Sequence, residues 1–117
     1  MAYRFEKLEI WKDSVECARR IYRLTENFPK HELYGLTSQL RRAAVSISSN
    51  IAEGSASESV KEFKLFLNYS IRSVAEVVSE LYLATTMGYL GESDYRSSYE
   101  ESEVLIKRIT AFRKALS

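Results

Sequence analysis

The side chains of this sequence that could most readily do chemistry are five arginines near the junction of its first two predicted helices. They are Arg19, Arg20, Arg23, Arg41 and Arg42. A guanidinium group can hold a phosphate through two parallel hydrogen bonds, so paired arginines suit the backbone of RNA or DNA. The sequence therefore predicts a basic end of the molecule that contacts nucleic acid.

A competing interpretation comes from the acidic residues at the start of the last predicted helix, which we expect at the same end. They are Glu92, Asp94, Glu100, Glu101 and Glu103. The arginines would then form ion pairs between helices or between subunits, each worth only about 0 to 1 kcal/mol at an exposed site. Both interpretations stay open on the sequence alone.

A second constellation is a row of small and polar residues beside the apolar face of the second predicted helix. Its members are Gln39, Ala43, Ser46, Asn50 and Glu53, and Gly54 follows them. Small side chains let another helix approach closely, whereas a covered Asn50 or Glu53 without a partner would cost about 1 to 3 kcal/mol. This flank predicts an interface rather than a catalytic cleft.

Catalytic, metal and cofactor chemistry has little support. The single cysteine, Cys17, excludes an internal disulfide, and with only one histidine a zinc site within one chain is not expected. The sequence has neither a phosphate-binding glycine loop nor a nucleophile elbow, and Glu53 lacks a suitably spaced His, Cys or second carboxylate. We expect no catalytic residues, no metal, no cofactor and no small-molecule substrate.

Composition favours one helical domain over residues 1–117. The chain is 45% hydrophobic, which is enough for a core. One proline and four glycines are too few turn-forming residues for many short strands, so long helices are favoured. Seventeen basic and sixteen acidic residues give a net charge of +1, which by itself indicates no partner. The sequence shows neither the apolar core of a signal peptide nor an 18-residue apolar run, so we expect a cytoplasmic protein with no membrane partner.

Four helices should position these groups, at about 8–28, 34–54, 59–87 and 93–116. Pro29 stops the first, Gly54 suits a left-handed residue after the second, and Ser59 with Glu62 forms a capping box for the third. On the first helix the spacing puts Leu8, Trp11, Val15, Ala18 and Tyr22 on one line and Ile21, Leu24 and Phe28 on the next. On the last helix it faces these residues inward: Tyr95, Tyr99, Leu105, Ile109, Phe112 and Leu116. Short links predict an antiparallel up-down-up-down four-helix bundle.

The third predicted helix carries more apolar surface than one bundle can cover. Its polar stripe, Lys61, Lys64, Asn68, Arg72, Glu76 and Ser79, is narrow. Apolar residues cover about half its circumference, whereas a surface helix needs a stripe of roughly 100°. Because large exposed apolar patches usually mark interaction sites, we expect a homo-oligomer, although Tyr69, Tyr82 and Leu83 could also be ordinary half-exposed residues.

The second helix also resembles a known family. Gly35-Leu36, Gln39 to Ala44, Ser46-Ile47 and Asn50 to Gly54 match the 23S ribosomal RNA intervening-sequence proteins, which are related to the accessory variability protein of diversity-generating retroelements. The chain departs from the family pattern at Ser48, where proline is common, at Arg72, where glycine is common, and at Ser57 and Glu58, where basic residues are common.

The resemblance implies a four-helix bundle that assembles into a ring-shaped homopentamer without enzymatic activity. The retroelement relative is thought to bind nucleic acid and a reverse transcriptase. We therefore expect a non-catalytic homo-oligomeric scaffold that binds RNA or DNA through the basic end. The alternative is a protein-binding adaptor with no nucleic-acid role.

Overall fold

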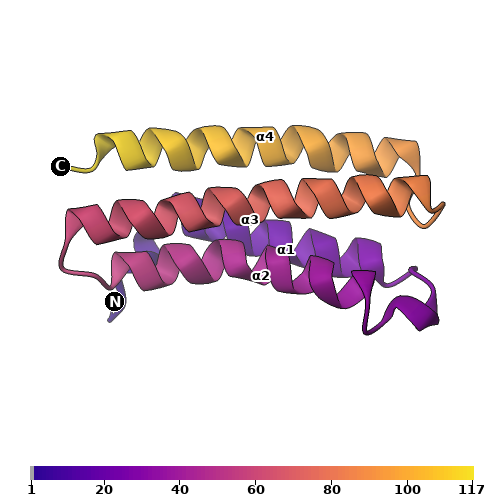
Figure 1. Cartoon of the computed structure of the whole chain (residues 1–117). Coiled ribbons are helices and arrows are strands. Elements are labelled where there is room, and N and C mark those ends of the chain that lie inside the picture. The colour runs from indigo at the N-terminus through magenta and orange to yellow at the C-terminus, as the bar shows by residue number, and fades with distance from the viewer. Residues whose placement is uncertain (1) are drawn as a thin grey trace.

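Four long helices make up most of the computed structural model, which describes residues 2–117, so the predicted all-helical class is confirmed. The helices are α1 (Glu9–Thr25), α2 (Leu36–Ser55), α3 (Val60–Thr86) and α4 (Glu92–Ala115), with two 3-10 turns, η1 (Arg4–Lys7) and η2 (Lys30–Glu32). Figure 1 shows the helices side by side, with the chain turning back at each link. The described residues form a rod of 44 × 23 × 21 Å.

Helix α1 ends at Thr25, three residues before the predicted end at Phe28. The chain leaves the helix through a turn in which the Phe28 amide donates to the Thr25 carbonyl, and Pro29 then prevents a return to helix. Phe28 is buried all the same, and its ring lies 5.7 Å from that of Tyr89. The aromatic side chain therefore closes the end of the core from outside the helix.

Of the two lines predicted on the first helix, the one with Ile21 and Phe28 faces the core, whereas Tyr22 of the other line is 44% exposed. The remaining apolar residues of that other line are only half-buried. Two buried positions of α1 are polar, Ser14 and Thr25. Their hydroxyl groups donate to the carbonyl four residues earlier, at 2.7 and 2.8 Å, so these small polar side chains can face the core.

Gly54 does not end α2 as a left-handed residue, because the helix continues through it to Ser55. The left-handed glycine among the described residues is Gly88, with φ of +80°, between α3 and α4. A Cβ atom on Gly54 would lie 2.7 Å from Phe66 Cβ and 2.9 Å from Phe63 Cδ1. Gly54 is therefore a packing residue where α2 and α3 approach most closely.

The start of α3 follows the prediction in part. The Ser59 hydroxyl accepts a hydrogen bond from the Glu62 amide at 3.2 Å, which caps the helix. The Ser59 amide, however, donates to the Ser57 hydroxyl at 3.1 Å, so the link before the helix supplies the second half of the cap. On α4, Tyr99 was expected inside but is 44% exposed.

Candidate interaction surfaces

The α1–α2 groove is the most developed hollow on the basic half of the bundle. It consists of two adjoining depressions of about 450 and 540 Å³ that share Tyr22 and Val45. Their apolar walls are made by Val15, Ala18, Tyr22, Leu33, Tyr34 and Val45, and their basic rim by Arg19, Arg23, Arg41 and Arg42. Tyr34 is 94% exposed. An apolar floor and a basic rim thus share one surface.

Four of the five predicted arginines lie along this groove, and the fifth turns away from it. Arg20 forms an ion pair with Glu101 of α4, on the other side of α1. This pair was the outcome expected if the arginines serve to join helices. Arg19 lies 3.1 Å from the Glu16 carboxylate, a partner on its own helix.

Arg41 is held in place by two contacts with α1. Its Nε donates to the Thr25 hydroxyl at 2.9 Å, and its guanidinium carbon lies 4.7 Å from the centre of the Tyr22 ring. A guanidinium group over an aromatic face is favourable, but it also uses one face of each group. Arg41 therefore shapes the groove wall, and Arg23 and Arg42 project from α1 and α2 as exposed residues.

One end of the small-residue flank of α2 lies against α3 of the same chain, because an added Cβ on Gly54 would meet Phe63 and Phe66. Beside the flank, the Ser70 hydroxyl of α3 donates to the Ile47 carbonyl of α2 at 2.7 Å. The other members differ in burial: Ala43 is buried, Ser46 and Asn50 are half-buried, and Gln39 and Glu53 are exposed.

Asn50 does not depend on a partner across an interface. Its side-chain amide donates to the Ser46 carbonyl at 2.9 Å, one turn earlier in α2. The Asn50 side chain is therefore bonded within its own helix. Between residues 2 and 117, no group of three His, Cys, Asp or Glu side chains is placed to hold a metal ion.

Comparison with known proteins relates this chain to one protein family. A family model described as 23S rRNA-intervening sequence protein matches residues 6–111. The chain belongs to this family. A crystal structure from Bacteroides thetaiotaomicron, described as a protein with unknown function from the S23 ribosomal protein family, is 25% identical, with a TM-score of 0.79. The alignment covers 91% of this chain and 99% of that one. No curated protein matches the sequence.

The family assignment agrees with the second-helix motif on which the resemblance was based. That motif spans the residues that line the α2–α3 contact and the α2 wall of the groove. None of the helices described here is long and apolar enough to cross a membrane.

This intervening-sequence family protein also has a carboxylate pair that the sequence did not single out. Glu76 and Glu80 lie one turn apart on α3, and the Glu80 Oε1 atom is buried without a hydrogen-bond partner among residues 2–117. Burial, and then the neighbouring charge of Glu76, raises the pKa of Glu80 to about 7. The signal was visible as two glutamates spaced i, i+4 in an apolar segment.

A second polar cluster joins the loops at the end of the bundle that carries η2. The Tyr89 hydroxyl donates to one oxygen of Glu32 at 3.0 Å, and the other oxygen accepts from the Leu36 amide at 3.1 Å. These bonds, that from Leu36 first, lower the pKa of Glu32. The ring nitrogen Nε2 of His31 lies 3.3 Å from the same Tyr89 hydroxyl. The cluster is a structural clasp that caps α2.

Proposed function

We propose that this protein is a non-catalytic scaffold that self-associates, with the α1–α2 groove as a docking face for a second copy. The observation that carries the proposal is the pair of exposed side chains on the groove floor, Tyr22 of α1 at 44% and Val45 of α2 at 41%. Half-buried Val15 and Ala18 of α1 lie beside them and extend the apolar surface. One copy of the chain leaves Tyr22 and Val45 uncovered.

The composition of the groove supports a protein partner. Tyrosine and arginine are enriched among the residues that dominate binding energy in protein interfaces, and Leu33 and Val45 add apolar area between them. Arg41 is already oriented by Thr25 and Tyr22, so little side-chain freedom would be lost on docking. A homopentamer, which the family resemblance implies, is the assembly we propose.

Light scattering of the purified chain at tens of micromolar tests the proposal directly. We expect the wild type to have the mass of an oligomer and Val45→Glu to have the mass of a monomer, because the change places a charge on the groove floor. Val60→Glu is the matched control, since Val60 is 39% exposed against 41% for Val45 and lies on another face, at the start of α3.

Either of two results would contradict self-association through the groove. The first is a wild type that is monomeric at these concentrations while its circular dichroism is fully helical. The second is equal dissociation of the Val45→Glu and Val60→Glu variants. A helical monomer would favour the alternative function, an adaptor that docks a different protein in the same groove.

The sequence also predicts that the five arginines bind nucleic acid. The contacts that these arginines make within the chain favour this function less than protein docking. Arg20 is paired with Glu101, Arg19 with Glu16, and Arg41 is stacked on Tyr22. That leaves Arg23 and Arg42 as the exposed members with no ion pair among the described residues. Two separated guanidinium groups make a weak polyanion site.

A further inference from the structure

A second basic surface lies at the other end of the bundle, on α3 and α4. Residues 63–75 and 104–117 contain no aspartate or glutamate, although the whole chain is almost neutral at +1. The two segments pack together: Phe63 and Phe112 have ring centres 5.7 Å apart, and Arg113 donates to the Asn68 side chain. Folding therefore joins two stretches of uncompensated positive charge that lie about forty residues apart in the sequence.

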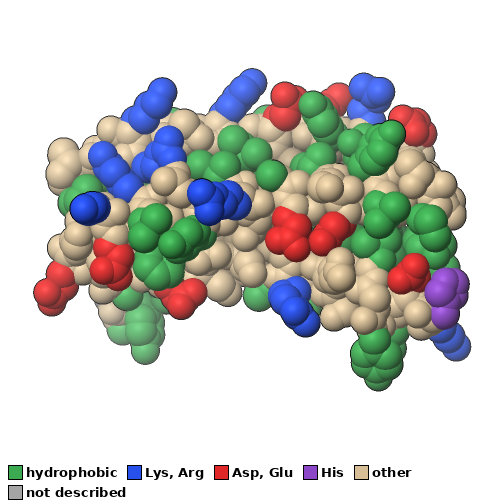
Figure 2. Space-filling model, in the orientation of Figure 1, with side chains coloured by type: hydrophobic (Ala, Val, Ile, Leu, Met, Phe, Trp, Pro, Cys, Tyr) green, Lys and Arg blue, Asp and Glu red, His purple; other side chains and the backbone are tan. Residues whose placement is uncertain are grey.

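Lysine and arginine side chains gather on this surface in Figure 2, over the first half of α3 and the last half of α4. The α3–α4 basic patch consists of Lys61, Lys64, Arg72, Lys107, Arg113 and Lys114. None of the six forms an ion pair with any residue from 2 to 117. The remaining basic residue of these segments, Arg108, is 2.8 Å from Asp13 of α1 and so is directed elsewhere.

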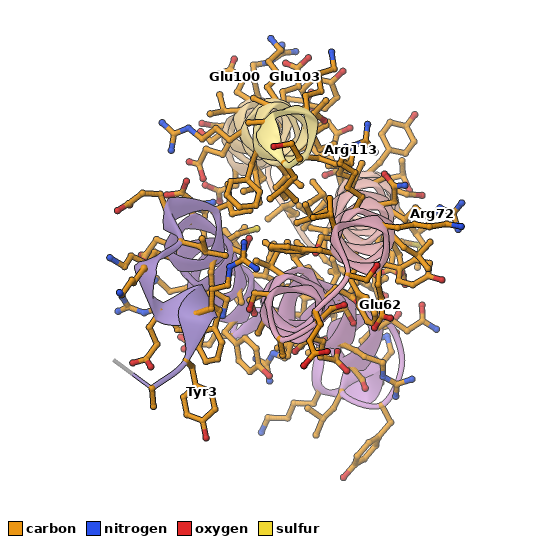
Figure 3. All side chains as sticks on the ribbon, turned by 90° about the vertical axis from the view of Figure 1, so that its left-hand side faces the viewer. Tyr3, Glu62, Arg72, Glu100, Glu103 and Arg113 are labelled. Atoms are coloured by element: carbon orange, nitrogen blue, oxygen red, sulfur yellow. The ribbon has the colours of Figure 1, made fainter. Side chains whose placement is uncertain are left out.

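The view along the bundle shows how the charges are divided around the two helices. In Figure 3, Arg113 lies between α4 and α3 and Arg72 projects from α3. Glu100 and Glu103 project from the outer side of α4, away from α3, and Glu62 lies on the side of α3 nearer α2. The seam between α3 and α4 is therefore positive along the first half of α3 and the last half of α4, and exposed Glu76, one turn beyond Arg72, ends the positive stretch before Tyr82.

A tyrosine ladder continues the same seam beyond the basic patch. On α3, Lys64, Asn68 and Tyr82 lie on one stripe, since their spacings of four and fourteen residues return to the same helix face. The Tyr82 ring is 5.9 Å from that of Tyr95, which is 6.2 Å from that of Tyr99 on α4. Tyr82 is 60% exposed and Tyr99 44%, so both offer ring surface to a ligand.

We propose that the α3–α4 seam binds single-stranded nucleic acid, with phosphates on the basic patch and bases stacked on Tyr82 and Tyr99. Proteins that bind single strands without sequence preference combine a positive track with aromatic rings that accept any base. The seam has both, in line, and Lys64 and Tyr82 are about 27 Å apart along α3. This length accommodates several nucleotides. The proposal does not depend on self-association through the α1–α2 groove.

Other anionic partners fit the surface less well. An anionic membrane would attract the lysines, but the tyrosines form a row of edge-on and tilted ring contacts and not an apolar face that could enter lipid. An acidic protein segment would pair with the charges and leave the ladder unused. A strand with both phosphates and flat bases uses the two halves of the seam together.

Fluorescence anisotropy with a labelled oligouridine at two salt concentrations tests the proposal on the intact chain. Lys64→Ala, Arg72→Ala and Lys114→Ala together should weaken binding at least about tenfold and reduce the slope of log affinity against log salt by about 2. The matched control removes the same number of charges from exposed positions outside both the seam and the α1–α2 groove: Lys7→Ala, Lys12→Ala and Lys30→Ala. It should keep most of the affinity and the slope.

The tyrosine ladder has its own arm of the experiment. Tyr82→Ala should weaken oligouridine binding about tenfold through loss of stacking, whereas Tyr3→Ala, at a 65% exposed tyrosine outside the seam and the groove, should leave it unchanged. A duplex of matched length should bind more weakly than the single strand, because paired bases cannot stack on the rings. Circular dichroism and light scattering confirm that every variant keeps the fold and mass of the wild type.

Three outcomes would overturn the proposal. The seam triple variant could bind oligouridine as tightly as the wild type, or the control triple of Lys7, Lys12 and Lys30 could lose more affinity than the seam triple. Vesicles of phosphatidylserine and phosphatidylcholine could bind while the oligonucleotide does not. In that last case the patch recognises a lipid surface and not a nucleic acid.

Discussion

The α2–α3 and α1–α4 contacts show two different ways in which one chain joins helices. Between α2 and α3, Gly54 lets the backbones approach and the Ser70 hydroxyl bonds directly to the Ile47 carbonyl. Between α1 and α4, two ion pairs, Arg20 with Glu101 and Arg108 with Asp13, border a cavity of about 240 Å³ beside the buried Cys17. The α2–α3 contact is made by close packing, whereas the α1–α4 contact is made by ion pairs beside a cavity.

The difference indicates where the bundle is rigid and where it can yield. Close packing loses dispersion energy steeply when atoms move apart, whereas exposed ion pairs tolerate movement and contribute little. We therefore expect α2 and α3 to form the stable centre and α4 to separate from α1 first when the structure opens locally. The proposed nucleic-acid seam lies on α4, the helix with more freedom.

The largest expected effect breaks the close contact. Gly54→Ala should lower the free energy of unfolding by about 3 kcal/mol, because the new methyl group would lie under 3 Å from Phe66 and Phe63. Urea denaturation followed by circular dichroism measures the change. Gly91→Ala is the control, since Gly91 has φ of −75° and nothing within 4 Å of its added Cβ. Equal stability of the two variants would show that α2 and α3 can move apart freely.

A smaller effect concerns Glu80 on the same side of α3. Glu80, Ser73 and Phe66 are spaced by seven residues and so share a stripe, and Phe66 borders Gly54 of α2. Since burial and Glu76 raise the pKa of Glu80 from 4.5 to about 7, the folded state holds a proton that the unfolded state releases between these values. Stability contributed by the neutral form is therefore present at low pH and is lost as the pH rises through 7.

Glu80→Gln should remove this dependence, because the amide stays neutral. We expect the variant to be more stable than the wild type by about 1 kcal/mol at pH 8, after allowance for the partial exposure of the side chain, and equal to it near pH 4. Thermal unfolding at both pH values measures the difference. The exposed Glu103→Gln serves as the control. A variant that is less stable at pH 8 would mean that the Glu80 carboxylate has an unrecognised cationic partner.

The smallest thermodynamic effect belongs to the α1–α4 contact. A double-mutant cycle of Arg20→Ala and Glu101→Ala should give a coupling energy of at most about 1 kcal/mol, and it should shrink in high salt because the pair is partly exposed. A coupling energy of several kcal/mol would mean that the ion pair stabilises the α1–α4 contact strongly. The difference in stability that we infer between the α1–α4 and α2–α3 contacts would then be wrong.

Cys17 provides a kinetic measure of the same contact. Burial raises the pKa of its thiol and slows its reaction with an alkylating reagent, so reaction requires the α1–α4 contact to open. Glu101→Ala should accelerate alkylation several-fold with little change in global stability. Alkylation that keeps strictly to the rate of global unfolding would exclude local opening at this contact.

The sequence predicted the elements of the fold well because helix formation is a local property. Apolar spacing located four helices, Pro29 marked the region where the first one ends, and Ser59 was identified as the cap of α3. Errors arose where a neighbouring element decides. The sequence indicates a helix terminator at Gly54, although contact with α3 is what requires this glycine. It predicts that Tyr99 faces inward, although its side chain is 44% exposed in the bundle.

The interaction surfaces were harder to predict from the sequence, because they too depend on which helices are neighbours. Arginines close in sequence were grouped as one basic end, yet Arg20 points to α4 while the others lie along the α1–α2 groove. The α3–α4 basic patch was missed because its two acid-free segments are far apart in the chain. Each acid-free segment is visible in the sequence, but the contact between the two segments is not.

By itself, the sequence determined that this chain forms four amphipathic helices of the intervening-sequence family, since periodicity, caps and a distinctive second helix are written in neighbouring residues. Only the tertiary structure decided which flank of each helix is covered and which charges meet. Helix periodicity fixes the angle of a side chain about its own axis, whereas its partners depend on how closely the other helices can approach.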